Sequence, residues 1–437
     1  MGQFFKYIFA SLLGTLIGLT IFSFLSLMVF LGIVFAVSGS EDKNVADSSV
    51  LKINLDHEIE ERSSDDFLSS LNPFDSEERG TIGLLNLRHS IRHAKTDDKI
   101  KGIFLDLHNT HHGFASLEEL RNTLIDFKSS GKFIVAYSET YSEGSYYLAS
   151  IADKIFLPSS GLLEFNGLKV ELLYFKGTLD KLLIKPEVFK VGEFKSAVEP
   201  FLFDKMSDAN RKQVKSFLNS IYNVYLANVA RARGLNETIL RDVSENMLVR
   251  NADDALKYKL ITDVGYYDQV GEYIRTKLNK GSKDKINFVS YPKYESSIEK
   301  NKEHDDDADV AVIFASGEIQ QGKGNDHVIG SEKTAAEIRK ARMNDKVKAI
   351  VIRINSPGGS AIASDIIWRE IYLARKVKPV IASMSDVAAS GGYYIAMACD
   401  TIVAHPNTIT GSIGVFGLLF NGKDFLKEKM GITSDVE

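Results

Sequence analysis

The sequence contains two copies of one pattern, and this duplication limits the folds that the chain can adopt. Residues 99–107 (KIKGIFLDL) resemble residues 346–354 (KVKAIVIRI), which lie 247 positions later. At the same spacing, residues 146–157 and 393–404 are identical at five of twelve positions. These segments are short and rich in aliphatic residues, many of them β-branched, as buried strands are.

A third match lies near the start of each copy. Residues 50–60 align with residues 310–320 at a spacing of 260, so the first copy holds 13 additional residues, which we place in the polar stretch 63–80. Three matches in the same order predict a tandem duplication. The second copy stops before its counterpart of residues 191–290 and is therefore expected to be incomplete at its C-terminus.

Both copies alternate strands with helices. Residues 132–137 and 379–384 have the composition of strands, and Ser116 with Glu119 forms the pattern of a capping box at a helix start. Residues 205–232, after Asp204, predict a long amphipathic helix. Strand–helix–strand units of this kind predict an α/β fold with mainly parallel sheets.

The N-terminus is long and apolar enough to cross a membrane. Residues 7–40 contain no charge, and as a helix they would extend about 50 Å, against roughly 30 Å of hydrocarbon. A cleaved signal peptide is the alternative, because residues 36–38 imitate a cleavage site, but its apolar part should span only about 7–15 residues. We therefore expect an uncleaved anchor. Lys6 before it and Glu41 after it favour a cytoplasmic N-terminus, with the rest outside the cytoplasm.

These observations predict four parts. The expected parts are an anchor at 1–45, a first copy at 46–294, a charged connector at 295–309 and a second copy at 310–437.

Composition excludes several classes of function. The chain has 53 basic and 58 acidic side chains, a net charge of −5, so a nucleic-acid partner is not expected. Its one cysteine, Cys399, excludes an internal disulfide and a zinc site built on several cysteines.

Two segments of the second copy could carry chemistry. Residues 355–360 (NSPGGS) follow a strand, and paired glycines let backbone N–H groups approach an oxyanion. An ordinary turn, or a phosphate site without the Walker lysine, is the alternative. Ser390 lies between a strand and a helix, where its hydroxyl meets the positive end of the helix dipole. A plain helix cap is the competing interpretation of this serine.

A nucleophilic serine needs a base, and histidines are poor candidates here. His405 precedes a proline and is predicted to be a surface residue. His108, His111 and His112 lack the spacing of metal ligands, so no metal is expected. Lys195 lies in an apolar, strand-like segment with Val191, Phe194, Ala197 and Val198, and a lysine kept neutral by burial can act as a base. A solvated surface charge is the alternative interpretation of this lysine.

Taken together, these segments resemble the signal peptide peptidase A (protease IV) family in its long, membrane-anchored form. This family of bacterial serine proteases has a Clp/crotonase-like fold and a Ser–Lys dyad. The resemblance extends over nearly the whole chain and rests on the duplication, the anchor and five motifs, VGEFKSAVEPF, MSDANRKQVKSFLNSIY, INSPGGS, SDVAASGGYYIA and TGSIGV.

The resemblance implies a role for each candidate residue. Ser390 would be the nucleophile, Lys195 the general base and Ser412 the residue that orients the lysine. The oxyanion donors would be Gly391 and one of Gly358 or Gly359. No metal or cofactor is implied.

The duplication implies that the two copies share one centre. Glu143 stands where the first copy would have the serine, and the counterpart of Lys195 would be position 442. Lys195 of the first copy and Ser390 of the second should therefore meet across the interface between copies, and neither copy should act alone.

The resemblance also implies the biological setting. The substrates would be cleaved signal peptides or other unfolded apolar peptides, taken up at the bacterial inner membrane by a homotetramer. A crotonase-like acyl-CoA enzyme and a non-catalytic membrane scaffold are the alternative functions.

Overall fold

The computed structural model describes residues 2–37, 44–56, 58–62, 81–108, 112–299 and 309–435. The N-terminal helix lies in one compact unit, and the described residues from Ala46 onward lie in a second. Helix α1 (Gly2–Val37) holds a segment, Gly2–Phe30, whose mean hydropathy of 2.2 and length suit a membrane span. This agrees with the predicted apolar anchor.

The first repeat is built on a parallel six-stranded sheet. Its strand order is β10-β7-β5-β4-β1-β11, and every neighbouring pair is parallel. The strands are β1 (Ser49–Asn54), β4 (Ile100–Asp106), β5 (Phe133–Tyr137), β7 (Lys154–Leu157), β10 (Asp263–Val264) and β11 (Asn287–Ser290).

The second repeat has the same central order. Its sheet runs β12-β16-β17-β18, again parallel throughout, and β19 pairs with the far end of β17. The strands are β12 (Val310–Ser316), β16 (Ala349–Ser356), β17 (Val380–Ala389), β18 (Thr401–Val403) and β19 (Ile409–Gly411). The order β12-β16-β17-β18 corresponds to β1-β4-β5-β7, so the α/β prediction is confirmed.

Two aspartates show how closely the repeats correspond. The Asp153 carboxylate accepts a 2.8 Å hydrogen bond from the N–H of Ile134, and the Asp400 carboxylate accepts one of 2.8 Å from the N–H of Val380. The backbone N–H of each aspartate also donates a 2.8 Å hydrogen bond to the carbonyl of the same partner residue. The identical residues found by aligning the copies therefore have identical structural roles.

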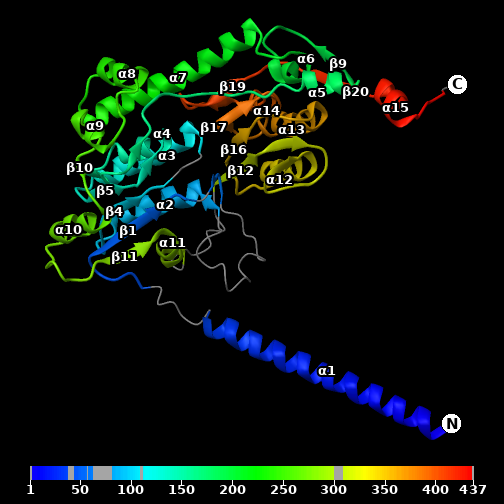
Figure 1. The fold of residues 1–437 in the computed structure, drawn as a ribbon, viewed down its shortest axis with the longest axis horizontal. Coiled ribbons are helices and arrows are strands. Elements are labelled where there is room, and N and C mark those ends of the chain that lie inside the picture. Colours follow the sequence, from blue (N-terminus) through cyan, green and yellow to red (C-terminus); the bar gives the residue numbers. More distant parts are fainter. Residues whose placement is uncertain are drawn as a thin grey trace. The chain divides into compact units, whose positions relative to one another are not determined.

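Helices flank both sheets (Figure 1). The first repeat has α2 (Leu84–Thr96), α3 (Phe114–Lys128) and α4 (Glu143–Ala149), followed by α8 (Glu237–Glu245), α9 (Ala252–Lys257), α10 (Tyr267–Lys277) and α11 (Tyr291–Glu299). The second has α12 (Ser331–Met343), α13 (Ala361–Ala374), α14 (Gly391–Ala396) and α15 (Lys423–Met430). Fully buried aliphatic side chains of β16, β17 and α13 form the core of the second repeat.

Several short strands and one longer connecting segment complete the chain. Those of the first repeat are β2 (Ile59–Glu60), β3 (Ile82–Gly83), β6 (Thr140–Tyr141) and β8 (Leu162–Leu163), and those of the second are β13 (Glu318–Gln320), β14 (Gly324–Asn325) and β15 (Val328–Gly330). Between β8 and α8 lie α5 (Lys176–Lys181), β9 (Lys185–Lys190), η2 (Ser196–Val198), α6 (Glu199–Leu202) and α7 (Asp208–Arg233), and β20 (Phe416–Asn421) precedes α15.

The structure corrects two predicted helix starts. Helix α3 begins at Phe114, so the predicted capping box at Ser116 is wrong, and a carboxylate from the other repeat takes over the cap. Asp386 accepts 2.9 Å hydrogen bonds from the N–H groups of Ala115 and Ser116. Helix α7 begins at Asp208 rather than after Asp204, because the Ser207 hydroxyl caps it by accepting from the N–H of Asn210 at 3.1 Å.

The predicted connector is partly helical. Its first residues, Glu295 to Glu299, belong to α11, and residues 300–308 lie outside the described part of the chain.

A buried ionic cluster joins the two repeats. Arg353 on β16 donates to Glu61 at 2.8 Å and lies 2.8 Å from Glu119 of α3, while its guanidinium also donates to Ser385 at 2.9 Å. Arg353 and Glu61 are 9% and 6% exposed. Because buried charges must be paired, these contacts fix one relative position of the repeats.

Candidate active site

Ser390 stands at the junction of β17 and α14 in a strained backbone conformation. Its φ of 53° and ψ of −115° lie outside the regions that L-residues favour. A side-chain cap bond to α14 is absent among the described contacts, so the helix-cap interpretation does not account for this serine. Strain of this kind persists where the surrounding structure enforces it, which is common at functional sites.

Lys195 of the first repeat reaches this serine. Its amine, Nζ, donates to the Ser390 hydroxyl at 3.1 Å, to the Ser412 hydroxyl at 3.1 Å and to the Ser412 carbonyl at 2.6 Å. Ser390 and Ser412 lie 195 and 217 positions after Lys195 in the sequence, and the three predicted site residues thus share one hydrogen-bonded cluster.

An antiparallel strand pair between the repeats produces this meeting. Strand β9 pairs with β20 from Lys190↔Phe416 to Lys185↔Asn421. Lys195 follows β9 and Ser412 precedes β20, so both lie beyond the same end of the ribbon. Figure 1 shows the two strands side by side at the far side of the second sheet.

The Lys195 amine is buried by the second repeat rather than by its own sequence neighbours. Lys195 is 5% exposed, whereas Val191 and Phe194, two of the four apolar neighbours in its segment, are 84% and 51% exposed. Of the other two, Val198 is fully buried and Ala197 is exposed. The Phe416 ring lies 6.0 Å from the amine instead, and the segment itself is a loop, not a strand. Burial lowers the pKa of Lys195, which favours the neutral amine.

The glycine-rich loop lies directly against Ser390. A Cβ on Gly358 would come within 2.5 Å of the Gly391 nitrogen and 2.9 Å of the Ser390 Cβ. The loop is held by Ile319, which bonds to the Gly358 carbonyl at 2.9 Å and to the Ser360 N–H at 2.8 Å. The N–H of Gly358 donates to Ser356 Oγ at 3.1 Å. All three predicted oxyanion glycines therefore belong to the loop and helix start that border the serine.

Sequence reasoning missed the residue that anchors the lysine loop. Glu199 is 1% exposed, and its carboxylate accepts from the Ser207 hydroxyl at 2.6 Å, the Ser207 N–H at 3.2 Å and the Asn210 amide at 2.9 Å. These contacts tie the turn after Lys195 to the start of α7. The motif around Lys195 contains Glu199, but a lone glutamate gives no signal of burial.

Asp386 was also missed, although it lies in the same motif as Ser390, four residues earlier. Its carboxylate caps α3 of the first repeat and so connects β17, the strand that leads to Ser390, to the other repeat.

The histidines take other roles. His405 is less exposed than the sequence suggested, with 17% of its side chain accessible and Nδ1 3.6 Å from Glu118. His108 pairs with Asp56 at 2.9 Å, His112 accepts from the N–H of Ile59 at 3.3 Å, and His111 lies outside the described residues. Within the described ranges, no group of three potential metal ligands is found.

The first repeat has no serine at the matching place. Glu143 occupies it, 9% exposed, and its carboxylate accepts from the N–H groups of Asn166 and Gly167, each at 3.1 Å. Burial raises the pKa of Glu143. A carboxylate bound in this way fills the position and provides no nucleophilic hydroxyl.

Comparison with known proteins identifies the family. Peptidase family S49 matches residues 126–280 and 373–436. "Protease 4" of Haemophilus influenzae is 35% identical over 93% of this chain and 70% of its own length. "Protease 4" of Salmonella typhi is 39% identical over 80% of this chain and 58% of its length, and "Serine protease SPPA, chloroplastic" of Arabidopsis thaliana is 35% identical over 90% and 57%. The match thus covers between 57% and 70% of these relatives. The chain belongs to peptidase family S49, and its enzyme class is serine-type endopeptidase.

Proposed function

We propose that this chain is a membrane-anchored endopeptidase in which Ser390 is the nucleophile and Lys195 is the general base. The observation that carries the proposal is the 3.1 Å contact between the Lys195 amine and the Ser390 hydroxyl, made by a lysine that is only 5% exposed. This distance lies within the range of about 2.6–3.2 Å that proton transfer requires.

The proposed reaction is acyl transfer through the serine. The neutral amine of Lys195 takes the proton of the Ser390 hydroxyl while the oxygen attacks the peptide carbonyl carbon. The resulting ammonium then gives that proton to the leaving amine as the peptide C–N bond breaks. Water, deprotonated by the same lysine, hydrolyses the acyl-enzyme and regenerates the serine.

The oxyanion would be bound by backbone N–H groups. Gly391 is the first residue of α14, so its N–H belongs to the helix terminus that has no partner within the helix. The second donor would be Gly358 or Gly359. If Gly358 is this donor, its N–H must divide its hydrogen bond between the Ser356 hydroxyl and the oxyanion. Each such donor contributes roughly 10²–10³-fold to kcat.

Ser412 would orient the base. Its hydroxyl and carbonyl both lie within hydrogen-bond distance of the Lys195 amine. When the two N–H groups of the neutral amine donate to these two oxygens, the nitrogen lone pair is left to accept the proton of the Ser390 hydroxyl.

The substrates that we propose are cleaved signal peptides and other unfolded apolar peptides. An apolar helix at the N-terminus would keep the site beside peptides that lie in the membrane. A single-pass anchor in the bacterial inner membrane with the catalytic part outside the cytoplasm, and assembly into a homotetramer, are parts of the same proposal.

The test is active-site labelling together with peptide hydrolysis. A fluorophosphonate should label the wild-type protein at Ser390, and Ser390→Ala should lose both labelling and hydrolysis. Lys195→Ala should reduce hydrolysis by about 10²–10⁴-fold, the range for loss of a general base. Lys423→Ala, at an exposed lysine of the second repeat, is the matched control and should retain full activity. Undiminished hydrolysis in Ser390→Ala or Lys195→Ala would refute the dyad.

A further inference from the structure

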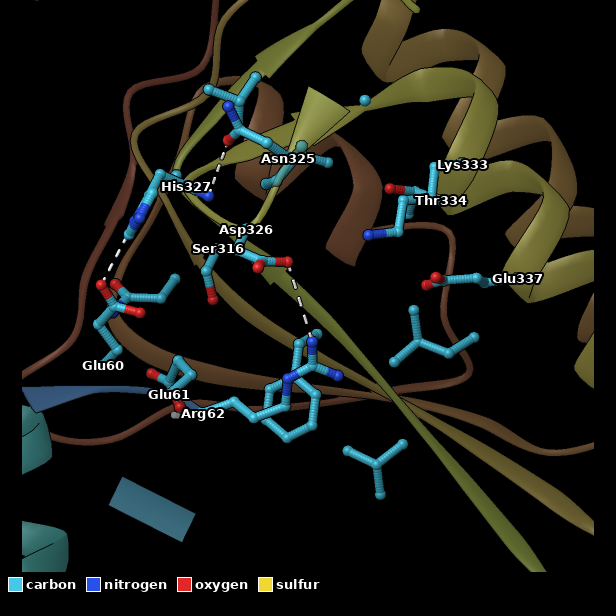
Figure 2. A pocket seen from close by; sticks show the side chains of 18 of the residues that line it. Glu60, Glu61, Arg62, Ser316, Asn325, Asp326, His327, Lys333, Thr334 and Glu337 are labelled. Atoms are coloured by element: carbon cyan, nitrogen blue, oxygen red, sulfur yellow. Dashed lines mark hydrogen bonds and ion pairs between the residues drawn. The ribbon is translucent and has the colours of Figure 1, made fainter. Parts of the chain in front are cut away.

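The amine of Lys195 has no opposite charge beside it. Figure 2 shows the more usual arrangement, at a cavity of about 580 Å³ beside β12 and α12, where Glu60 lies 3.3 Å from His327 and Arg62 lies 3.9 Å from Asp326. Lys195 does not line this cavity, and among the described residues it forms no ion pair. A buried cation without a partner is costly, so burial by itself favours the neutral amine.

The hydrogen bonds of Lys195 leave its protonation state undecided. As an ammonium it can donate to the Ser390 hydroxyl and to both oxygens of Ser412. As an amine it can donate to the two Ser412 oxygens and accept from the Ser390 hydroxyl. Both forms are fully hydrogen-bonded, so exclusion of water is what separates them, because water stabilises the ammonium far more than the amine.

The charged side chains on neighbouring elements do not determine this protonation either. Burial lowers the pKa of Lys195 without a contribution from another charge. Strands β19 and β20 and residues 412–415 between them contain no titratable side chain. The other elements around the site carry Lys190 on β9, Glu193 and Glu199 after it, Asp386 on β17, and Tyr393 and Tyr394 on α14. The neutral amine therefore depends on apolar groups that keep water away.

An aromatic ring lies beside the amine. It belongs to Phe416, the first residue of β20, and its centre is 6.0 Å from Lys195 Nζ. Phe416 pairs with Lys190 at the end of β9, and residues 191–194 lead from there to Lys195, so the ribbon brings the ring to the amine. The phenylalanine is 40% exposed and the lysine 5%, as expected where a ring separates an amine from solvent.

A ring in this place has two opposing effects on the amine. Its face attracts an ammonium, but about 6 Å is the outer limit of a cation–π contact, where the attraction is weak. Its bulk excludes water, which lowers the pKa of a buried lysine far more strongly. The pKa of Lys195 is lowered, so the second effect has the observed sign.

The first repeat, which lacks the serine, has a different residue at this place. At the repeat spacing of 247, Phe416 corresponds to Lys169, and Gly414 corresponds to Gly167. The two glycines have φ of 138° and 93°, so both repeats turn the chain there. The Lys169 side chain is 78% exposed and pairs with Glu171 at 2.6 Å. The aromatic residue thus occurs in the repeat where a reacting amine lies against this turn.

We propose that Phe416 is a positioning residue for the general base: its ring covers the solvent side of the Lys195 amine, excludes water and so keeps the free amine that accepts the Ser390 proton. This inference rests on the proposed Ser390–Lys195 dyad. Removal of the ring would let water stabilise the ammonium, and a higher pH would then be needed to release the base.

The pH dependence of kcat/KM tests this role, measured with an internally quenched apolar peptide and, in parallel, by the rate of fluorophosphonate labelling. We expect Phe416→Ala to move the midpoint upward, so that kcat/KM falls about tenfold at neutral pH and equals the wild-type value on the alkaline plateau. Phe416→Thr, which suits a strand and is less apolar, should move it in the same direction. Phe416→Leu keeps an apolar side chain and should retain the wild-type midpoint.

The matched control is Leu419→Ala. Leu419 is 61% exposed and lies on the opposite face of β20, so its removal should leave the profile unchanged. General damage to the site would lower kcat/KM at every pH without moving the midpoint, and that result would overturn the proposal.

Two further results would also overturn it. A midpoint that stays in place in Phe416→Ala and Phe416→Thr would show that the ring does not act on the amine. A midpoint that moves downward in Phe416→Ala and Phe416→Leu would show that the ring stabilises the ammonium instead. The dyad is tested separately by Ser390→Ala and Lys195→Ala: if these lose activity while the Phe416 variants keep the wild-type profile, only the present inference fails.

Discussion

The amine of Lys195 is removed from water by residues that are distant in sequence, and this sets its protonation. Burial lowers its pKa from the ordinary value of 10.5, and the favoured neutral form is the one that can accept a proton. The unfolded chain therefore binds more protons than the folded chain between the lowered and the ordinary pKa. In that window the contribution of Lys195 to stability rises with pH.

Activity is expected to rise with pH as Lys195 loses its proton. The rise in kcat/KM should be centred below 10.5, because the folded-state pKa is lowered. The measurement is the pH dependence of peptide hydrolysis, with the rate of fluorophosphonate labelling as a second reading of serine reactivity. A flat profile from acid to alkaline pH would contradict a lysine base.

Gly358 is expected to tolerate no side chain. Its φ is +97°, and a Cβ would meet the Gly391 nitrogen at 2.5 Å, so Gly358→Ala should displace a proposed oxyanion donor and reduce kcat by roughly 10²–10³-fold. Gly422→Ala is the control, since a Cβ there has nothing within 4 Å and φ is −100°. Equal activities of the two variants would show that the loop does not act in catalysis.

At the scale of elements, the β9–β20 ribbon decides whether the site forms. It is a two-stranded sheet, and such ribbons are marginally stable by themselves. Its far end carries Lys195 and Ser412, so an error in its register would separate the amine from the serine. The Glu199 contacts to the start of α7 hold the segment that follows Lys195.

Breaking this ribbon should abolish activity while the repeats remain folded. Leu418→Pro removes a backbone N–H from β20 opposite Val188, whereas Leu418→Thr keeps it and suits a strand. We expect Leu418→Pro to lose at least 90% of Ser390 labelling with an unchanged circular dichroism spectrum, and Leu418→Thr to retain labelling. If the proline variant labels normally, Lys195 is positioned by something other than the ribbon.

At the scale of the whole molecule, the buried charges at the repeat interface are essential to its integrity. Arg353→Met leaves the buried Glu61 without its cation, while Glu119 keeps its ion pair with Arg88, and the loss should destabilise the fold by about 3–5 kcal/mol. Arg339→Met removes a cation that is 54% exposed, so its pair with Glu370 should contribute only about 0–1 kcal/mol. Thermal unfolding of both variants measures the difference, and similar melting temperatures would argue against the interface cluster.

The N-terminal helix is expected to set location and not chemistry. Deletion of residues 2–43 removes α1, and the remaining chain should move from the carbonate-resistant membrane fraction to the soluble fraction. Ser390 should still label, because every residue of the candidate site lies beyond Ala46 in the second compact unit. A truncated chain that stays in the membrane fraction would show that another segment binds the bilayer.

The sequence by itself determined the elements that depend on local pattern. The strands around residues 100–106 and 349–356 follow from their local composition, the N-terminal helix from an uninterrupted apolar run, and the duplication from the direct alignment of the two copies. The resemblance to a peptidase family assigned roles to Ser390 and Lys195, because each of them lies within its own short, continuous motif.

Only the tertiary structure showed which of these segments contact one another and which side chains the contacts bury. The cap of α3 comes from Asp386 rather than from Ser116, and the burial of Lys195 comes from the second repeat rather than from Val191 and Phe194. Each of these depends on contacts between segments roughly 200 or more residues apart, and such contacts leave no periodic signal in the chain.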